Sequence, residues 1–252
     1  MEKNRVANYL AGVCALYFIG SAVVAHAQTT TLPFTPTMTA GGTALVNQRV
    51  LANADGSYTV TGAQQGGGSV GAPVWGLTWD LTLNQDPSII GSLTLSNLTN
   101  TTRNFNLAFS LPILSAFSPS LYGGSIDATL FDANNSGSAT MAPIAISPSI
   151  YRGTIDGVTV LSLFSGSMAC SGGAGCSGTN SEIFGLPGPT EPGPAVNSAI
   201  GMFLNFSLTA GDRVTFATSF TVEPPAPVPL PASLPLMLAG LGALVRKRRA
   251  AI

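Results

Sequence analysis

The sequence predicts an all-β protein whose main domain is an antiparallel β-sandwich. Apolar and polar residues alternate with a period of two in several short runs, which is the pattern of strands with one buried face. Turn dipeptides such as Asp55-Gly56 and Asp156-Gly157 separate these runs. No stretch between residues 28 and 223 combines a sustained 3.6-residue period with helix caps. Many short strands divided by frequent turns are typical of sandwiches.

Residues 1–27 have the features of a secretory signal peptide. A basic start precedes the apolar run Leu10–Val24. Ala25, His26 and Ala27 then form a small-x-small pattern, which predicts cleavage before Gln28. The apolar run of about 15 residues is shorter than the roughly 20 residues of a membrane-spanning helix. An uncleaved membrane anchor is therefore the disfavoured alternative.

The segment that follows, residues 28–222, is expected to be one sandwich ectodomain. Its length of just under 200 residues is sufficient for one sizeable core. Up to residue 223 it holds four arginines, no lysine and ten acidic residues, which is a net charge of −6. We expect no nucleic-acid partner, because nucleic-acid binding requires a basic patch.

Seven runs are expected to form strands. Trp75–Leu83 places both tryptophans and three leucines on one side, and Val214–Val222 places its even-numbered residues on one side. Ser92–Ser96 and Phe105–Leu111 alternate on either side of a short Asn- and Thr-rich segment, which predicts a β-hairpin. The other expected strands are Ala128–Asp132, Val158–Phe164 and Met202–Leu208.

Three stretches interrupt the strand pattern, and a fourth follows it. Gln64–Gly71 is expected to be a flexible loop. Ser167–Ser181, rich in Gly and Ser, and Gly185–Pro194, with four prolines, are expected to form one long irregular excursion. Residues 223–229 also contain four prolines and are expected to form a stiff, extended spacer.

Cys170 and Cys176 are the cysteines that remain after removal of the signal peptide. An even pair in an exported chain predicts a disulfide. Closing a loop of seven residues stabilises the fold by roughly 2.4 kcal/mol in the chain-entropy model. A redox or metal-binding pair is the alternative, but five intervening residues do not match the two-residue spacing of a redox motif.

The chemistry of residues 28–223 is limited by the absence of histidine and lysine, since His26 leaves with the signal peptide. Histidine-based catalysis, histidine-ligated zinc and Schiff-base chemistry are excluded. We therefore expect no enzyme, no catalytic residues, no cofactor and no metal site. A glycosidase built on two carboxylates is the remaining enzymatic alternative, with Asp80 beside Trp79 as its candidate.

A carbohydrate-binding surface is the main alternative to a purely structural domain. It would need exposed aromatic rings that stack on sugars. The candidates are Trp75, Trp79, Tyr122 and Tyr151.

The segment Asp132–Gly137 resembles the first half of a calcium-binding loop. Acidic, amide and hydroxyl side chains occupy alternate positions before a glycine. The twelfth position, which should carry an acidic ligand, is Pro143. We expect an ordinary hairpin turn here, with calcium binding as the alternative.

Residues 228–252 have the features of a sorting tail. The apolar segment of about 16 residues would form a helix about 24 Å long, short of a hydrocarbon core of roughly 30 Å. The basic cluster behind it is expected to stay in the cytoplasm as a stop. The motif ahead of the helix is Val228, Pro229, Leu230, Pro231 and Ala232, and the basic cluster is Arg246, Lys247, Arg248 and Arg249.

Over residues 224–249 the chain resembles the VPLPA variant of the PEP-CTERM sorting signal, although the commoner Pro-Glu-Pro is absent. Such tails occur on exported proteins of Gram-negative bacteria that make exopolysaccharide, and exosortases process them. The resemblance implies processing by signal peptidase and an exosortase, with the inner membrane as an intermediate. It also implies a final place at the cell surface or in the extracellular matrix, with exopolysaccharide as a partner. A structural surface or matrix protein is the function that this predicts.

Overall fold

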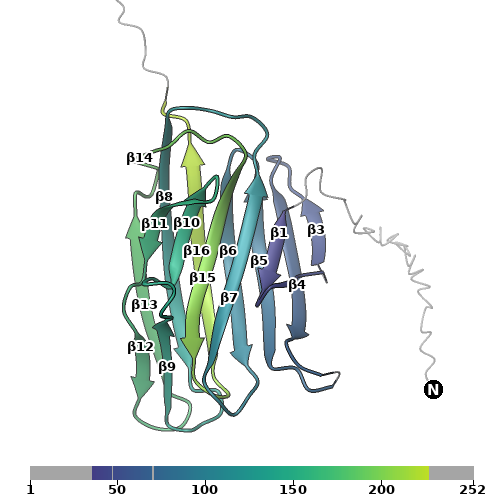
Figure 1. The fold of residues 1–252 in the computed structure, drawn as a ribbon, viewed down its shortest axis with the longest axis vertical. Helices are drawn as coiled ribbons and strands as arrows, with labels where there is room; N and C mark the ends of the chain where they lie inside the picture. Colours follow the sequence, from purple (N-terminus) through teal and green to yellow (C-terminus); the bar gives the residue numbers. More distant parts are fainter. Residues whose placement is uncertain (1–35, 47, 70, 227–252) are drawn as a thin grey trace, which may run out of the picture.

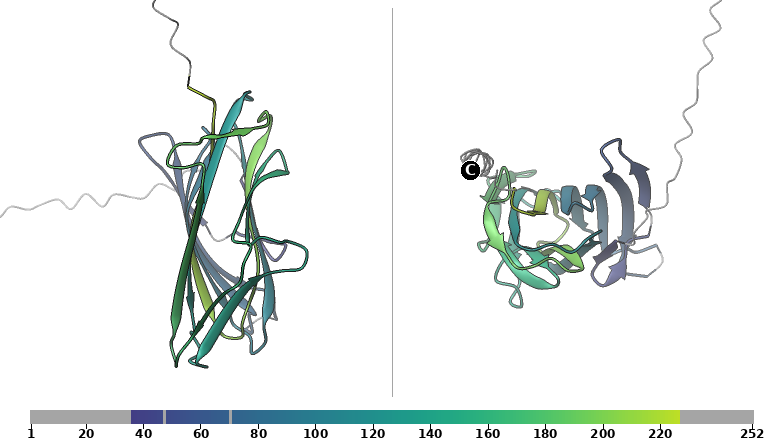
Figure 2. Two further views of the ribbon diagram at one scale, coloured as in Figure 1. Left: turned by 90° about the vertical axis from the view of Figure 1, so that its left-hand side faces the viewer. Right: turned by 90° about the horizontal axis from the view of Figure 1, so that it is seen from above.

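The computed structural model describes residues 36–46, 48–69 and 71–226, which form a two-layered antiparallel β-sandwich (Figures 1 and 2). The all-β fold class is thereby confirmed for this part of the chain. No helix that could cross a membrane occurs within these ranges. The described residues form sixteen strands: β1 (Thr37–Ala40), β2 (Thr43–Ala44), β3 (Gln48–Ala52), β4 (Tyr58–Gly66), β5 (Trp75–Asn84), β6 (Ser88–Asn97), β7 (Arg103–Pro112), β8 (Ser120–Phe131), β9 (Ser138–Pro143), β10 (Tyr151–Ile155), β11 (Val158–Leu163), β12 (Met168–Ser171), β13 (Ser177–Phe184), β14 (Glu191–Gly193), β15 (Ala199–Leu208) and β16 (Arg213–Glu223).

Each layer is a sheet of eight strands. Sheet A has the order β11-β10-β15-β7-β1-β2. Strand β9 shares the β10 edge of β15, pairing with the last residues of β15, and carries β12. Sheet B has the order β13-β8-β16-β6-β5-β4-β3, and β14 shares the outer edge of β8 with β13. The last two strands, β15 and β16, lie at the centres of opposite sheets, so the chain crosses the core between them.

The strictly alternating runs form strands with the predicted inward faces. In β5 both tryptophans and the three leucines point into the core. In β16 the even-numbered residues from Val214 to Val222 are all buried. Ala128–Asp132 is the end of the much longer strand β8, with Asp132 just beyond its last residue.

The predicted hairpin between Ser92–Ser96 and Phe105–Leu111 is wrong. Both runs are strands, but β6 belongs to sheet B and β7 to sheet A. The side-chain amide of Asn97 holds the crossing by donating to the carbonyls of Thr101, at 2.8 Å, and Leu208, at 3.0 Å. Alternation cannot distinguish the two topologies, because a strand buries one face in either sheet of a sandwich.

Part of the predicted irregular sequence is strand. Within Ser167–Ser181 lie β12 and the start of β13, Gly185–Pro194 contains β14, and β4 extends into Gln64–Gly71. Strand β13 is exposed along almost its whole length and shows no hydrophobic alternation. It exists because the edge of β8 provides eight consecutive partners for its backbone.

The centre of the core is a contact between aromatic rings of opposite sheets. Phe206 of β15 and Phe216 of β16 meet edge to face, with 5.2 Å between ring centroids and 66° between ring planes. Phe105 of β7 lies 5.8 Å from Phe206. Such pairs are stabilising beyond their burial, because the positive edge of one ring faces the negative face of another.

The β10–β11 hairpin turns at Asp156 and Gly157, as the dipeptide predicts. Their φ angles of 49° and 80° are those of a type I′ turn. The Asp156 carboxylate also binds the segment that enters β15. It accepts the backbone amides of Asn197 at 2.8 Å, Ser198 at 2.8 Å and Ala199 at 3.0 Å, and the Ser198 hydroxyl at 2.7 Å.

These hydrogen bonds predict an acid-dependent contribution to stability. Partial burial raises the pKa of Asp156, but the hydrogen bonds outweigh it and hold the pKa well below its usual value. A carboxylate with a lowered folded-state pKa stabilises the fold above its unfolded pKa of about 3.9, and this stabilisation is lost as the pH falls further. We expect Asp156→Asn to be less stable than the wild type at pH 7, and the difference to shrink below about pH 4.

Urea unfolding at a series of pH values measures this difference. Asp127→Asn, which removes a carboxylate from the exposed face of β8, controls for the change in net charge. A difference between the wild type and Asp156→Asn that stays constant from pH 7 to pH 2.5 would contradict the prediction.

Candidate functional site

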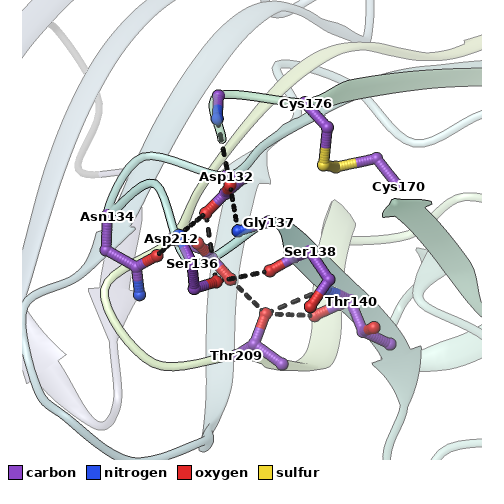
Figure 3. Close-up of a disulfide and its surroundings, with 11 residues drawn as sticks. Asp132, Asn134, Ser136, Gly137, Ser138, Thr140, Cys170, Cys176, Thr209 and Asp212 are labelled. Atoms are coloured by element: carbon purple, nitrogen blue, oxygen red, sulfur yellow. Dashed lines mark hydrogen bonds between the residues drawn. A yellow bond between two sulfur atoms is a disulfide. The ribbon is translucent and has the colours of Figure 1, made fainter. Parts of the chain in front are cut away.

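Two aspartates lie opposite each other at one end of sheet B (Figure 3). The register of β8 and β16 pairs Phe131 with Arg213, so Asp132, just past β8, lies opposite Asp212 in the β15–β16 turn. Both are buried, with 2% and 1% of their surfaces exposed. In Figure 1 this is the lower end of the sandwich, and β16 runs from here to the upper end.

The backbone of two loops holds the Asp132 carboxylate. Oδ1 accepts the amide of Ser136 at 2.9 Å and its hydroxyl at 3.2 Å, and Oδ2 accepts the amides of Gly137 at 2.8 Å and Gly175 at 3.0 Å. Burial raises the pKa of Asp132, but the hydrogen bonds lower it by a larger amount. The pKa of Asp132 therefore lies below its ordinary value. Asp132 is therefore ionised at neutral pH.

The Asp212 carboxylate is less well satisfied. Oδ2 accepts the hydroxyl of Thr209, whereas Oδ1 is buried and has no hydrogen-bond partner among the described residues. Burial raises the pKa of Asp212, and the charge of Asp132 adds to this rise, while Thr209 and the Ala133 amide oppose it. Like charges directly opposite each other on neighbouring strands destabilise a sheet. A cation or a proton at this pair would relieve the repulsion.

Neutral side-chain oxygens lie around the two carboxylates (Figure 3). Asn134 accepts the amide of Ser136 at 2.9 Å through Oδ1, and its own amide group donates to the carbonyl of Ala210. The hydroxyl oxygen of Thr209 also accepts the backbone amide of Thr140, at 2.8 Å. These bonds connect the β8–β9 loop with the β15–β16 turn, so the two carboxylates belong to one structural unit.

Cys170 and Cys176 form the predicted disulfide, with their Cα atoms 5.9 Å apart. The loop that it closes lies against Asp132. Within this loop Gly175 donates its amide to the Asp132 carboxylate, and the carbonyl of Cys176 accepts the amide of Asp132 at 2.9 Å. The disulfide therefore restrains a loop that supplies one of the four hydrogen bonds to this carboxylate.

The expected hairpin turn at Asp132–Gly137 is wrong, because this segment carries the chain from β8 in sheet B to β9 in sheet A. Pro143, at the twelfth position of the calcium-loop pattern, lies at the end of β9. The second carboxylate instead comes from Asp212, about eighty residues later. Sequence reasoning missed Asp212, since no local pattern connects it with Asp132.

The site contains only hard oxygen donors. Within the part of the chain that the structure describes, no group of three or more His, Cys, Asp or Glu residues lies around a single point. Both oxygens of Asp132 already accept two hydrogen bonds each. This carboxylate is therefore poorly placed to act as a nucleophile or a general base. The unpartnered Oδ1 of Asp212 is the atom of this pair that is available to a proton or an oxygen-seeking cation.

Most of the aromatic candidates for sugar stacking lie inside the core. Trp75 and Trp79 are 5% and 3% exposed, and Tyr151 is completely buried. Tyr122 is half-buried and stacks on Phe184 of β13, with 6.2 Å between ring centroids. Among the four candidates only Tyr122, together with its stacking partner Phe184, offers aromatic surface to a ligand.

Among the described residues, the glycosidase candidate Asp80 has no suitable partner on its face of the sheet. Trp79 points into the core, so it shares no surface with Asp80. The register across sheet B leads from Asp80 through Ser92 and Ala217 to Asp127. Three strand spacings separate the two carboxylates by about 14 Å, beyond the roughly 5 to 10 Å of a glycosidase pair.

The addressing segments lie outside the described residues. These are the signal cleavage residues Ala25, Ala27 and Gln28, the motif at 228–232 and the basic cluster at 246–249. Comparisons of the chain with protein-family models and with curated proteins found no match.

Proposed function

We propose that this chain is an exported structural protein of the cell surface or exopolysaccharide matrix, processed by an exosortase and without catalytic activity. The observation that carries the proposal is the order of features in the tail: Val228–Ala232, an apolar run and Arg246–Arg249. The folded domain leads directly into this tail, since β16 ends at Glu223, where the proline-rich spacer begins.

In this proposal the two ends of the chain act in sequence. The signal peptide directs export and is removed before Gln28. The apolar segment then inserts transiently into the inner membrane, and the basic cluster stays in the cytoplasm. The apolar segment is short and contains Gly240 and Gly242. Both features suit transfer to a membrane enzyme better than permanent anchoring.

The outer face of sheet B supports a role among hydrated polysaccharides. A row of threonines crosses five neighbouring strands, and one pair within it, Thr94 and Thr215, shares a hydrogen bond of 3.0 Å between hydroxyls. Such a face presents uncharged hydroxyl groups at the regular spacing of the strands. The row consists of Thr78, Thr94, Thr215, Thr129 and Thr179.

A carbohydrate-binding module is the second candidate, and the stacked pair of Tyr122 and Phe184 favours it. It has weaker support than the structural role, because the two tryptophans that would make the strongest platform are in the core.

Intact mass of the native protein recovered from its own host tests the proposal. We expect a chain that starts at Gln28 and stops between Val228 and Ala232. The double variant Pro229→Ala and Pro231→Ala, which leaves the helix and the basic cluster unchanged, should keep the uncut tail. A wild-type chain that still ends at Ile252 would show an ordinary membrane-anchored ectodomain and would overturn the proposal.

A further inference from the structure

The pair formed by Asp132 and Asp212 carries more negative charge than its protein surroundings neutralise. One buried oxygen of Asp212 has no hydrogen-bond partner within the described ranges. The neighbouring cationic side chain, Arg213, lies over the ring of Phe131, 4.9 Å from its centroid. A buried carboxylate without compensation is costly, so this arrangement indicates a missing positive partner.

We propose that Asp132 and Asp212 bind a calcium ion together with the side-chain oxygens of Asn134, Ser136 and Thr209. Calcium takes six to eight oxygen ligands and combines carboxylates with neutral oxygens and water. The alternation of Asp132, Asn134 and Ser136 before a glycine is the order in which calcium loops supply their first ligands. The tertiary fold supplies the second carboxylate through Asp212 in place of the twelfth loop residue.

The donors select calcium over other metals. Zinc and copper prefer nitrogen or sulfur ligands, whereas residues 28–223 contain no histidine and both cysteines are joined in the disulfide. Magnesium requires a near-ideal octahedron and gives up its water reluctantly. A site assembled from the β8–β9 loop and the β15–β16 turn can accommodate the variable geometry of calcium better.

Protonation of Asp212 is the competing way to remove the repulsion. A proton on this carboxylate would relieve the charge without involving the neighbouring oxygens of Asn134 and Ser136. A cation would also satisfy the unpartnered oxygen of Asp212 directly. With two carboxylates in the site, we expect an affinity in the range of extracellular modules, with a Kd of about 0.1 to 1 mM.

Thermal unfolding and calorimetric titration of the purified full-length protein test the site. At pH 7, 5 mM CaCl2 should raise Tm above its value in EDTA by about 2 to 8 °C, and 5 mM MgCl2 should raise it less. Calorimetric titration with CaCl2 should give a Kd of about 0.1 to 1 mM. Asp212→Asn should lose the calcium-dependent shift, while its Tm in EDTA should equal or exceed that of the wild type, because the repulsion is removed.

The controls separate this site from general effects of charge. Asp127→Asn, which removes an exposed carboxylate of β8, the strand that leads to Asp132, should keep the full calcium shift. If Asp212→Asn does not fold, Asn134→Ala at an exposed loop position provides the second test and should weaken calcium binding about tenfold. Absence of a calcium shift in the wild type overturns the proposal, and so does an unchanged shift in Asp212→Asn. A wild-type Tm that rises only when the pH is lowered would assign the pair to a shared proton instead.

Discussion

Replacing Phe206 by alanine is expected to lower the free energy of unfolding by about 4 kcal/mol, the middle of the range for Phe to Ala in a core. Phe206 is completely buried at the centre of sheet A and contacts Phe216 of the opposite sheet and Phe105 of its own. The substitution removes both ring contacts and leaves a cavity between the layers. Because whole domains are stable by only about 5 to 15 kcal/mol, this loss is a large part of the total.

Urea unfolding of the two proteins measures the effect. Phe203→Ala is the matched control, because it makes the same change on the same strand, where the half-buried ring lies beneath the guanidinium of Arg152. It should cost clearly less, about 1 kcal/mol. Equal losses for the two variants would mean that the Phe206–Phe216 contact does not hold the sheets together.

Removal of the disulfide is expected to have the next largest effect. The double variant Cys170→Ala and Cys176→Ala should lower the free energy of unfolding by about 2 kcal/mol, since the chain-entropy model gives roughly 2.4 kcal/mol for a loop of this length. The freed loop also carries the Gly175 amide that binds Asp132. The loss therefore combines a less restrained unfolded state with a weaker hydrogen bond in the folded state.

Urea unfolding with and without a reductant measures this effect. The wild type should become less stable in the reductant, whereas the double variant should be insensitive to it and should match the reduced wild type. Identical unfolding midpoints for the oxidised and reduced wild-type protein would contradict the prediction.

The strands that were predictable from the sequence are those whose pattern is local. In β5 and β16 the side chains alternate strictly between core and solvent, and a period of two is a property of the extended backbone itself. The Cys170–Cys176 pair was predictable for a similar reason, because seven residues rich in glycine readily close a loop. These features need no knowledge of distant parts of the chain.

Strands without a hydrophobic pattern could not be predicted in this way. Strand β13 is almost entirely exposed, so its extended form depends on hydrogen bonds with β8, a strand about fifty residues earlier. The wrong hairpin between β6 and β7 has a related cause. A short connection permits either a hairpin or a crossing, and only the packing of two sheets around one core selects between them.

The candidate site shows most clearly which features local sequence determines and which depend on the tertiary structure. The local pattern Asp132–Gly137 and the disulfide could be recognised from neighbouring residues, and so could the lack of histidine and lysine between residues 28 and 223, which limits the chemistry. The sorting tail is likewise a matter of local order and composition. That Asp212 lies opposite Asp132, and that both tryptophans are in the core, follows from the pairing of β8 with β16 and the packing of two sheets. Such contacts join residues far apart in the chain, and short-range periodicity contains no information about them.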